Sequence, residues 1–366
     1  MSVPLNDLSK SPSGESALIL EKIRNVILSG RFLLGEQVSS FEREFAEYIG
    51  CKHTISVANG TDALILALTA LGIKNGAEVI TVANAGMYSS LSIYHVGAKP
   101  IYADVRLDTM TMDISQLESL WSPRTAGVII THLYGRLANI DNIVAWCKLK
   151  NVSLIEDCAQ AHGAYSSKGR AGTFGDVACF SFYPTKNLGS LGDGGAITTS
   201  DASLAHKLRS LSQYGWSTKY QVELSGGFNS RLDEIQAAIL RIRLKVLDVA
   251  NEKRLKIAAM YSDLIVNPNI TLPVFDSSGG YVAHLYVVRC KERASLKEYL
   301  AARGIATDIH YPIPDHMQQA YYNSGISLPI TEKLCREILT LPCFPEMSID
   351  QAHEVIDGCN AWKKND

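Results

Sequence analysis

The amino-acid sequence predicts an α/β protein, with a large domain built on a mostly parallel central sheet and a smaller C-terminal α+β domain. Two observations predict this fold class. Short apolar, β-prone runs alternate with segments of helical periodicity between residues 53 and 156, and strands joined through helices pair in parallel through right-handed crossovers. The chain also has 366 residues, 46% of them hydrophobic, which is enough for one large core with a smaller one attached.

The first half of the chain carries the alternating pattern. An irregular arm covers residues 1–14, and apolar residues at helical spacing predict helices at 15–28 and 38–48. Strands are then expected at 53–57, 78–82, 100–104, 127–131 and 152–156, with helices at 61–71, 88–96, 115–121 and 140–149. Ligands on such sheets gather at the carboxyl ends of the strands, so the residues after each strand are candidates for a site.

The second half begins with strands at 177–181 and 196–200, which flank a glycine-rich passage. A long amphipathic segment follows, beginning near Arg231 and continuing to about Ile265, and we interpret it as a helix joining two domains. Beyond Pro268 the pattern predicts shorter elements, with strands at 282–289 and 305–310 and helices at 295–303, 332–338 and 349–359. We therefore predict a large domain over residues 1–248 and a small domain over residues 249–366.

Composition excludes several classes of protein. A formal net charge of -2 and a pI near 6.5 leave no electrostatic footprint for nucleic acid or an anionic membrane. The polar start and the lack of any apolar run of bilayer length predict a cytoplasmic protein without a membrane span. The eight cysteines form no CxxC pair, so we interpret them as reduced core residues and expect no metal site.

Lys186 is the residue around which the candidate site is organised. It lies between the strands expected at 177–181 and 196–200, with glycines crowding its C-terminal side. A lysine held in a partly desolvated pocket loses part of its preference for the charged form and becomes an amine nucleophile, as Schiff-base chemistry requires. The alternative is an ordinary solvated lysine in a glycine-rich turn.

Two strand ends supply further candidates. Gly60 and Thr61 follow the strand at 53–57 and open a helix, where main-chain N–H groups and a hydroxyl suit a phosphate; Thr61 alone could equally be a helix cap. Asp157 follows the strand at 152–156 and either caps a turn or holds a buried cation.

Other motifs are missing or ambiguous. The glycines at 189–195 lead into a strand and not a helix, so they do not match a dinucleotide fingerprint, and the P-loop, the Gly-x-Ser-x-Gly elbow and the metalloprotease histidine pair are absent. Three histidines stand in suggestive places, although a single histidine is more often structural than catalytic. These are His162, His310 and His316.

Four motifs then occur in register, namely GTDAL at 60–64, EDCAQAHG at 156–163, FSFYPTKNL at 180–188 and GFNSRLDEIQAA at 227–238. Together they resemble the DegT/StrS family of nucleotide-sugar aminotransferases that depend on pyridoxal 5'-phosphate (PLP), and the resemblance covers nearly the whole chain. It implies the aspartate aminotransferase-like fold, fold type I. By the same resemblance, Lys186 bonds covalently to PLP and later carries the substrate proton, and Asp157 pairs with the pyridine nitrogen.

The resemblance also implies how the rest of the cofactor is held. Gln160 would bond the 3-oxygen of the ring, Gly60 and Thr61 would hold the phosphate, and Ser181 would add a hydroxyl. Asn229 would reach the phosphate from the partner subunit of a homodimer with shared active sites; a simple helix N-cap is the alternative.

One position departs from the family pattern. Many members carry a ring-stacking aromatic residue eleven positions before the Gly-Ala that is here Gly97-Ala98, and this chain has Gly86 there. We predict that Tyr88 takes over the stacking with a local backbone shift that Gly86 allows; the alternative is that Tyr88 only packs in its helix.

His310 and Tyr311 are predicted to contact the sugar or its diphosphate, with a core or loop role as the alternative. Together with the Gly86 variant they are similar to the branch that aminates dTDP-linked 3-keto-6-deoxyhexoses, which implies L-glutamate as amino donor and a dTDP-3-amino-3,6-dideoxyhexose for polysaccharide or glycoconjugate biosynthesis. The alternatives are a 4-keto sugar aminotransferase, a non-catalytic PLP-binding sensor, and a dehydratase of the same family. The dehydratase is disfavoured because a histidine typically replaces the lysine there.

Overall fold

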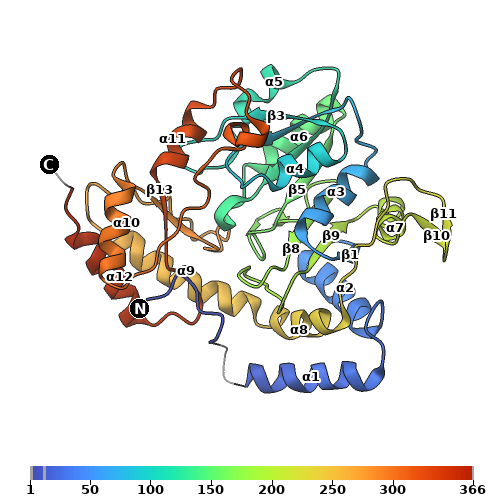
Figure 1. Cartoon of the computed structure of the whole chain (residues 1–366), viewed down its shortest axis with the longest axis horizontal. Helices are drawn as coiled ribbons and strands as arrows, with labels where there is room; N and C mark the ends of the chain where they lie inside the picture. The colour runs from blue at the N-terminus through green and yellow to red at the C-terminus, as the bar shows by residue number, and fades with distance from the viewer. Residues whose placement is uncertain (1–2, 11–13, 365–366) are drawn as a thin grey trace.

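A seven-stranded sheet forms the centre of the molecule (Figure 1). The computed structural model describes residues 3–10 and 14–364. The strand order is β1-β9-β8-β5-β4-β2-β3; β9 runs antiparallel to both of its neighbours, and the other neighbouring strands pair in parallel. The predicted α/β class with a mostly parallel sheet is confirmed. The strands are β1 (His53–Val57), β2 (Glu78–Val82), β3 (Lys99–Ala103), β4 (Thr125–Thr131), β5 (Ser153–Asp157), β8 (Val177–Ser181) and β9 (Gly195–Thr199).

Helices cover both faces of this sheet because successive strand residues point to opposite sides. On β5, Ile155 packs in the cluster that includes the apolar residues of α3, whereas Leu154 packs with Ile143 of α6 on the other side. One face carries α3 (Gly60–Ala70), α4 (Tyr88–His95) and α7 (Ala202–Leu211), and the other carries α2 (Glu36–Ile49), α6 (Ile140–Lys150) and α8 (Glu234–Leu244).

Helix α1 (Glu15–Ser29) lies at the edge of the molecule, along the bottom of Figure 1, and packs against α8. Glu234 of α8 ties the start of α2 in place, since its carboxylate accepts hydrogen bonds from the amides of Gly35, Gln37 and Val38 at 2.9 Å each. A carboxylate at a helix N-terminus satisfies N–H groups that have no partner inside the helix. The region predicted as one helix at 115–121 is a 3-10 turn, Ile114–Gln116, followed by the short α5 (Leu117–Leu120).

The C-terminal part has a core of its own, which includes the fully buried Tyr261, Tyr286 and Phe344 and also Val3 of the N-terminal arm. The predicted boundary near residue 248 stays a prediction; it falls in the first turn of α9. The elements of this part are α9 (Leu247–Leu264), β12 (Tyr286–Arg289), α10 (Arg293–Ala302), α11 (Pro329–Glu337), β13 (Ile338–Leu341) and α12 (Ile349–Ala361).

The prediction of one long helix beginning near Arg231 is wrong in two respects. The helical part begins only at Glu234, and the chain then breaks at Val246, whose φ of −118° is not helical, so that α8 and α9 are separate helices. Amphipathic periodicity continues through the break because both helices bury one face, but on different cores: α8 packs on α1 and α2, and α9 packs on α12. Sequence periodicity cannot register such a change of partner.

Two predictions in the C-terminal part are also wrong. Residues 305–310 form no strand and make only isolated bridges, between Ile305 and Val3 and between Asp308 and Thr340. The strand that pairs with β12 is β13, which begins at Ile338 where a helix had been expected to end. Both segments are short and apolar, and only the antiparallel partner decides which of them becomes a strand.

Short hairpins complete the described chain, β6 (Tyr165–Ser166) with β7 (Gly169–Arg170) and β10 (Trp216–Thr218) with β11 (Gln221–Val222). All eight cysteines are free thiols. Seven of them are buried, in agreement with their interpretation as core residues. Over the residues that the structure describes, no helix combines the length and apolar character needed to cross a bilayer.

Candidate active site

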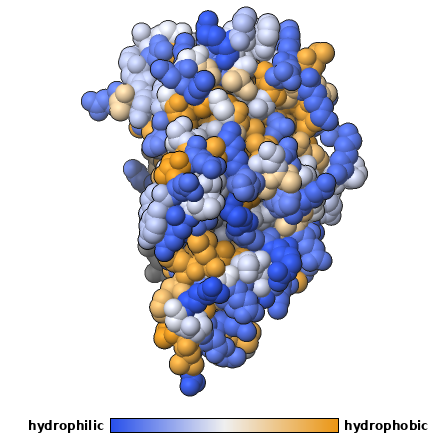
Figure 2. Space-filling model, turned by 90° about the vertical axis from the view of Figure 1, so that its right-hand side faces the viewer, coloured by the Kyte–Doolittle hydropathy of each residue, from blue (hydrophilic) through white to orange (hydrophobic). Residues whose placement is uncertain are grey.

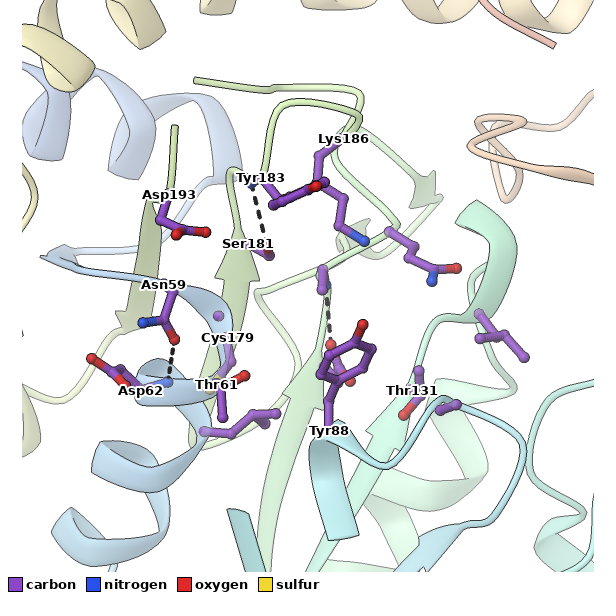
Figure 3. A pocket seen from close by; sticks show the side chains of 17 residues that line it. Asn59, Thr61, Asp62, Tyr88, Thr131, Cys179, Ser181, Tyr183, Lys186 and Asp193 are labelled. Atoms are coloured by element: carbon purple, nitrogen blue, oxygen red, sulfur yellow. Dashed lines mark hydrogen bonds between the residues drawn. The ribbon is translucent and has the colours of Figure 1, made fainter. Parts of the chain in front are cut away.

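A cavity of about 520 Å³ opens where the parallel strands end, and Lys186 lies on its wall (Figure 3). Below, it is called the inner cavity. Parallel strands bring their carboxyl ends to the same edge of a sheet, so residues distant in sequence meet here. The lining residues are Asn59, Gly60, Thr61, Asp62, Leu64, Ala85, Tyr88, Thr131, Leu133, Asp157, Ala159, Gln160, Cys179, Ser181, Tyr183, Lys186 and Asp193.

Lys186 is held on a tight passage between β8 and β9, as the sequence predicts. Its amide donates to the carbonyl of Tyr183 at 2.8 Å, and Ser190 closes the passage by donating its amide and its hydroxyl to the carbonyl of Phe182 at 2.8 and 2.7 Å. Figure 3 shows the amine reaching into the cavity, opposite Tyr88. Burial lowers the pKa of Lys186 to about 8, although the negative charge of Asp157 opposes this shift. Lys186 is partly buried and lines the cavity, which favours its interpretation as a site residue over an ordinary solvated lysine in a turn.

Asp157 ends β5 in the same cavity. Its carboxylate accepts a hydrogen bond from the amide of Ala159 at 3.1 Å and makes a long contact of 3.5 Å with the Ser89 hydroxyl. Burial raises the pKa of Asp157, while the Ala159 amide and the Lys186 charge favour the ionised form. A buried acid with so few partners can neutralise a cationic ring nitrogen.

The preceding residue, Glu156, has the opposite character. It points to the other side of β5 and accepts hydrogen bonds from the amides of Gly172, Phe174 and Gly175 at 2.9, 2.7 and 2.8 Å, with His132 Nε2 at 3.0 Å. Its acceptor capacity is filled by the fold itself. Of two adjacent acids, therefore, only Asp157 is available to a ligand.

The N-terminus of α3 forms one end of the inner cavity. Asn59, and not Thr61, caps this helix, because its side chain accepts from the Asp62 amide at 2.8 Å. The amides of Gly60 and Thr61 have no hydrogen-bond partner among residues 3–10 and 14–364. Ser181 lies beside them, since a Cβ on Gly60 would be only 2.8 Å from the Ser181 Cβ. Free N–H groups at a helix N-terminus with adjacent hydroxyls suit a phosphate.

Ser230 fixes the loop that carries these donors. Its hydroxyl accepts from the Ala58 amide at 3.0 Å and donates to the Asp62 carboxylate at 2.6 Å. Asn229, the predicted contact to a partner's cofactor, is exposed on the surface of the subunit, where its side-chain oxygen accepts from Arg231 Nε at 2.8 Å. It does not line the inner cavity of its own chain, which leaves the prediction of a contact across a dimer open.

Gln160 connects the inner cavity to a second one. Its Oε1 accepts from the Tyr134 amide at 2.7 Å, and its Nε2 donates to the Tyr311 hydroxyl at 3.2 Å. The second cavity, below called the outer cavity, has a volume of about 220 Å³ and shares Tyr88, Gln160, Tyr183 and Lys186 with the first. Its remaining lining residues are Leu5, Asn6, Thr185, Arg254, His284, Leu285, His310, Tyr311, Leu341 and Cys343.

Tyr88 is the first residue of α4 and lines both cavities. Its ring meets that of Tyr311 edge to face, with centroids 6.2 Å apart. Gly86 allows this pairing, because it has a φ of 78° and a Cβ there would lie 2.8 Å from the Tyr311 ring. Stacking of Tyr88 on a cofactor stays a prediction, and the structure adds that Gly86 makes room for Tyr311.

The three candidate histidines lie in different environments. His310 lines the outer cavity, and its Nδ1 lies 2.9 Å from the Thr340 hydroxyl. His162 is fully buried against Phe180 and Phe182, and burial lowers its pKa to about 3. His316 is buried with its Nε2 at 3.3 Å from Glu332. The last two line neither cavity, so only His310 remains a candidate for substrate contact.

Several lining residues were missed by sequence reasoning. Tyr183 lies within the lysine motif and could have been found there, since it stands between Ser181 and Lys186. Thr131 ends β4, and its buried hydroxyl has no partner among the described residues. Arg254 and His284 carry no local signal, because each lies in an ordinary helix or loop pattern.

Comparison with known proteins decides the family. A model of the DegT/DnrJ/EryC1/StrS aminotransferase family matches residues 14–360. The chain belongs to this family. The family is PLP-dependent, so the predictions of family, fold class and aminotransferase chemistry are confirmed.

Several similar proteins match almost the whole chain. A "dTDP-3-amino-3,6-dideoxy-alpha-D-galactopyranose transaminase" of Aneurinibacillus thermoaerophilus is 44% identical over 361 residues, covering 98% of this chain and 99% of the relative. The crystal structure of DesV from S. venezuelae in complex with a ketimine intermediate is 42% identical, with a TM-score of 0.95 and coverage of 100% and 99%. The structure of NtdA from Bacillus subtilis, with bound cofactor PMP, is 30% identical, with a TM-score of 0.92 and coverage of 98% and 84%.

The inner cavity of this chain fits the family cofactor. Its free amides at Gly60 and Thr61 suit the phosphate, the sparsely bonded Asp157 suits a protonated ring nitrogen, and Lys186 supplies an amine of lowered pKa. All of these residues line the same cavity and could together hold a phosphorylated pyridine there.

Proposed function

We propose that this family member transfers an amino group from L-glutamate to C3 of a dTDP-linked 3-keto-6-deoxyhexose, giving a dTDP-3-amino-3,6-dideoxyhexose for polysaccharide or glycoconjugate biosynthesis. The observation that carries the proposal is the single cavity that contains Lys186, Asp157 and the free amides of α3. The sugar class is supported by the relative that is 44% identical, which is named as a dTDP-3-amino-3,6-dideoxygalactose transaminase.

Each polar residue of the inner cavity has a different proposed role in the reaction. Bound PLP supplies an aldehyde that accepts the amino group and a ring that accepts an electron pair. Lys186 would hold the cofactor and, once freed, would carry a proton to or from the substrate carbon; in the cofactor-free chain burial lowers the pKa of its amine to about 8, which suits an acid and base near neutral pH. Asp157 stabilises the positive ring nitrogen, and Gln160 is oriented by the Tyr134 amide to bond the ring oxygen.

The outer cavity is the place proposed for the sugar. His310 and Tyr311 line it together with Tyr183, and Lys186 stands at its junction with the inner cavity. A ketone entering through the outer cavity therefore meets the lysine and the cofactor site together. Tyr311 is held by the Gln160 amide, which couples the position of the sugar contact to the position of the cofactor contact.

We also propose a homodimer with shared sites. Helix α1 and the segment after it expose large apolar side chains, and Figure 2 shows apolar surface at its lower end, where Figure 1 places this part of the chain. An exposed apolar patch of this kind marks an interaction surface. The exposed residues are Leu18, Leu20, Ile27, Leu28, Phe32, Leu33 and Leu34.

A direct assay tests the sugar assignment. The holoenzyme is given L-glutamate with either the 3-keto or the 4-keto dTDP-6-deoxyhexose, and the amino sugar is identified by NMR. Amination at C3 only is the expected result. Amination at C4 only would overturn the regiochemistry, and the lack of any amino sugar from either ketone would overturn the proposed function and favour a PLP-binding sensor.

Subunit mixing tests the shared site. Lys186→Ala and Asn229→Ala proteins are each expected to be impaired, whereas mixed dimers should regain activity because one of their two sites combines intact residues. Recovery is measured after the two proteins are exchanged and the hybrid dimer is isolated. An inactive hybrid would show that Asn229 does not act across the interface.

We also propose that the reaction takes place in the cytoplasm. The free thiols of the cysteines support this location, because disulfides are rare in reducing compartments.

A further inference from the structure

Arg254 is a buried cation on the wall of the outer cavity. It lies on α9 and is only 5% exposed. Its Nη1 donates to the carbonyl of Cys343 at 2.6 Å and approaches that of His284 at 3.5 Å. No hydrogen bond from its Nε or Nη2 to any described residue is found. A guanidinium carries five N–H donors, so the described residues leave part of its hydrogen-bonding capacity unused.

The charge of Arg254 is not neutralised within the described part of the chain. No carboxylate in residues 3–10 or 14–364 lies within 4.0 Å of it, and Glu346 acts on it only at longer range. Burial lowers the pKa of Arg254, because removing water disfavours the charged form. A buried, unpaired charge is costly, and that cost is offset when an anionic ligand binds. A neutral donor would be enough to satisfy the carbonyl of Cys343, so this hydrogen bond does not by itself explain a charged side chain at position 254.

His284 presents an acceptor beside Arg254. The side-chain amide of Asn187 donates to Asn251 Oδ1 at 2.8 Å and to the Val282 carbonyl at 3.1 Å, so its oxygen faces His284 Nδ1 at 2.9 Å. His284 Nδ1 must therefore carry the proton, which leaves Nε2 as the acceptor. The side chain is 5% exposed and lines the outer cavity, and burial beside Lys186 and Arg254 keeps it neutral by lowering its pKa.

We propose that Arg254 binds a carboxylate of the amino donor in the outer cavity, with His284 Nε2 accepting a hydrogen bond from the same molecule. This inference rests on the proposed function, since it names the binding site of the donor. The charged fork of an arginine matches the two oxygens of a carboxylate. Because Lys186 lines the same cavity, a donor held at Arg254 has its amino group on the side of the cofactor site.

The diphosphate of a sugar nucleotide is a second anion that an arginine can bind, and the geometry favours the carboxylate. A diphosphate is joined at both ends to large groups and needs an open passage, whereas a terminal carboxylate can enter a closed end. Arg254 is only 5% exposed, and the cavity of about 220 Å³ that it lines also contains Leu5 and Asn6 of the N-terminal arm, so a small terminal group reaches it more readily than a diphosphate substituted at both ends.

Binding to the PLP-loaded enzyme tests the inference without turnover. Glutarate, an unreactive dicarboxylate, is titrated by calorimetry into wild type and Arg254→Gln, and glutaramide and dTDP are titrated in parallel. Glutarate should bind roughly 10- to 150-fold more weakly to Arg254→Gln, the range expected for losing hydrogen bonds to a charged group, while glutaramide and dTDP change less than about threefold.

Arg293→Gln is the matched control. Arg293 also donates from Nη1 to a carbonyl, that of Cys335 at 2.6 Å, but it lies on α10 and lines neither the inner nor the outer cavity. Its replacement should leave glutarate affinity within about threefold of wild type, because it removes a similar structural bond without a ligand contact.

Three results would overturn the inference: unchanged glutarate affinity in Arg254→Gln, an equal or larger loss of dTDP affinity, or an equal loss in Arg293→Gln. Should Arg254→Gln not fold, wild type alone decides, because a carboxylate site requires glutarate to bind at least tenfold more tightly than the neutral glutaramide. Arg254→Lys, which keeps the charge but loses the fork, should be intermediate. A wrong assignment of the sugar substrate would not change the glutarate titrations. Failure of the proposed function and failure of the donor site at Arg254 can therefore be told apart.

Discussion

The inner and outer cavities meet at Lys186 but are built differently. The inner cavity is made by the ends of β1, β4, β5 and β8, and its key groups come from contiguous motifs. The outer cavity combines the N-terminal arm, α9 and the segments around His284 and His310, whose polar side chains are held mainly by backbone carbonyls and by one another. A rigid sheet edge thus positions the reacting groups, and segments from the smaller C-terminal core shape what may approach them.

The largest effect is expected for Lys186→Ala, which removes the amine from the junction of both cavities. Turnover should fall below detection, because no other residue can bond the cofactor and carry the proton. The variant should fold, since no described hydrogen bond depends on the side chain, and Lys168→Ala on the surface is the control. Borohydride treatment of wild type followed by peptide mass analysis locates the modified lysine; label at another lysine would refute the assignment.

The two adjacent acids on β5, Glu156 and Asp157, are expected to affect different properties of the protein. Asp157→Asn should lower turnover roughly 100- to 1000-fold with little change in unfolding, because a neutral amide cannot stabilise the ring nitrogen. Glu156→Gln should instead lower the free energy of unfolding by about 2–3 kcal/mol, since three amides lose a charged acceptor. Steady-state kinetics and denaturant unfolding measured on both variants check this, and the opposite pattern would reverse the assignments of the two acids.

A methyl group at position 86 perturbs the outer cavity selectively. Gly86→Ala places a Cβ 2.8 Å from the Tyr311 ring, and we expect sugar-dependent turnover to fall about 10- to 100-fold while PLP binding persists. Gly76→Ala is the matched control, because Gly76 also has a positive φ, of 87°, but no atom within 4 Å of its added Cβ. Equal kinetic losses in both variants would show backbone strain and not displacement of Tyr311.

The desolvation of Lys186 also predicts a pH dependence of stability in the PLP-free protein. Burial lowers the pKa of Lys186 from 10.5 to about 8, so the unfolded chain binds more protons between these values and stability rises with pH across that window. The gain is at most about 3.5 kcal/mol, because the shift is about 2.5 pKa units and one unit corresponds to about 1.4 kcal/mol. The free energies of unfolding of wild type and Lys186→Met are measured with denaturant from pH 7 to 11, and the second is subtracted from the first. A difference that does not change with pH would contradict a desolvated amine.

Most of the sheet and the inner cavity could be predicted from the sequence. Alternating apolar runs located the strands, and the positions of Gly60, Asp157 and Lys186 just after strands made them candidates, whose cofactor roles the four family motifs then implied. The break at Val246 and the strand β13 were missed. Both depend on which core a segment packs against, and periodicity reports only that one face is buried.

What the sequence determined by itself is therefore which residues gather in the inner cavity, because residues within a few positions of a strand end are carried to the same edge of the sheet. Only the tertiary structure decided the outer cavity. Arg254, His284 and Tyr311 stand far apart in the chain, and no local pattern distinguishes a buried arginine that lacks a carboxylate from one on a helix surface. That distinction arises from packing, which removes water from the charge and leaves a ligand as its available partner.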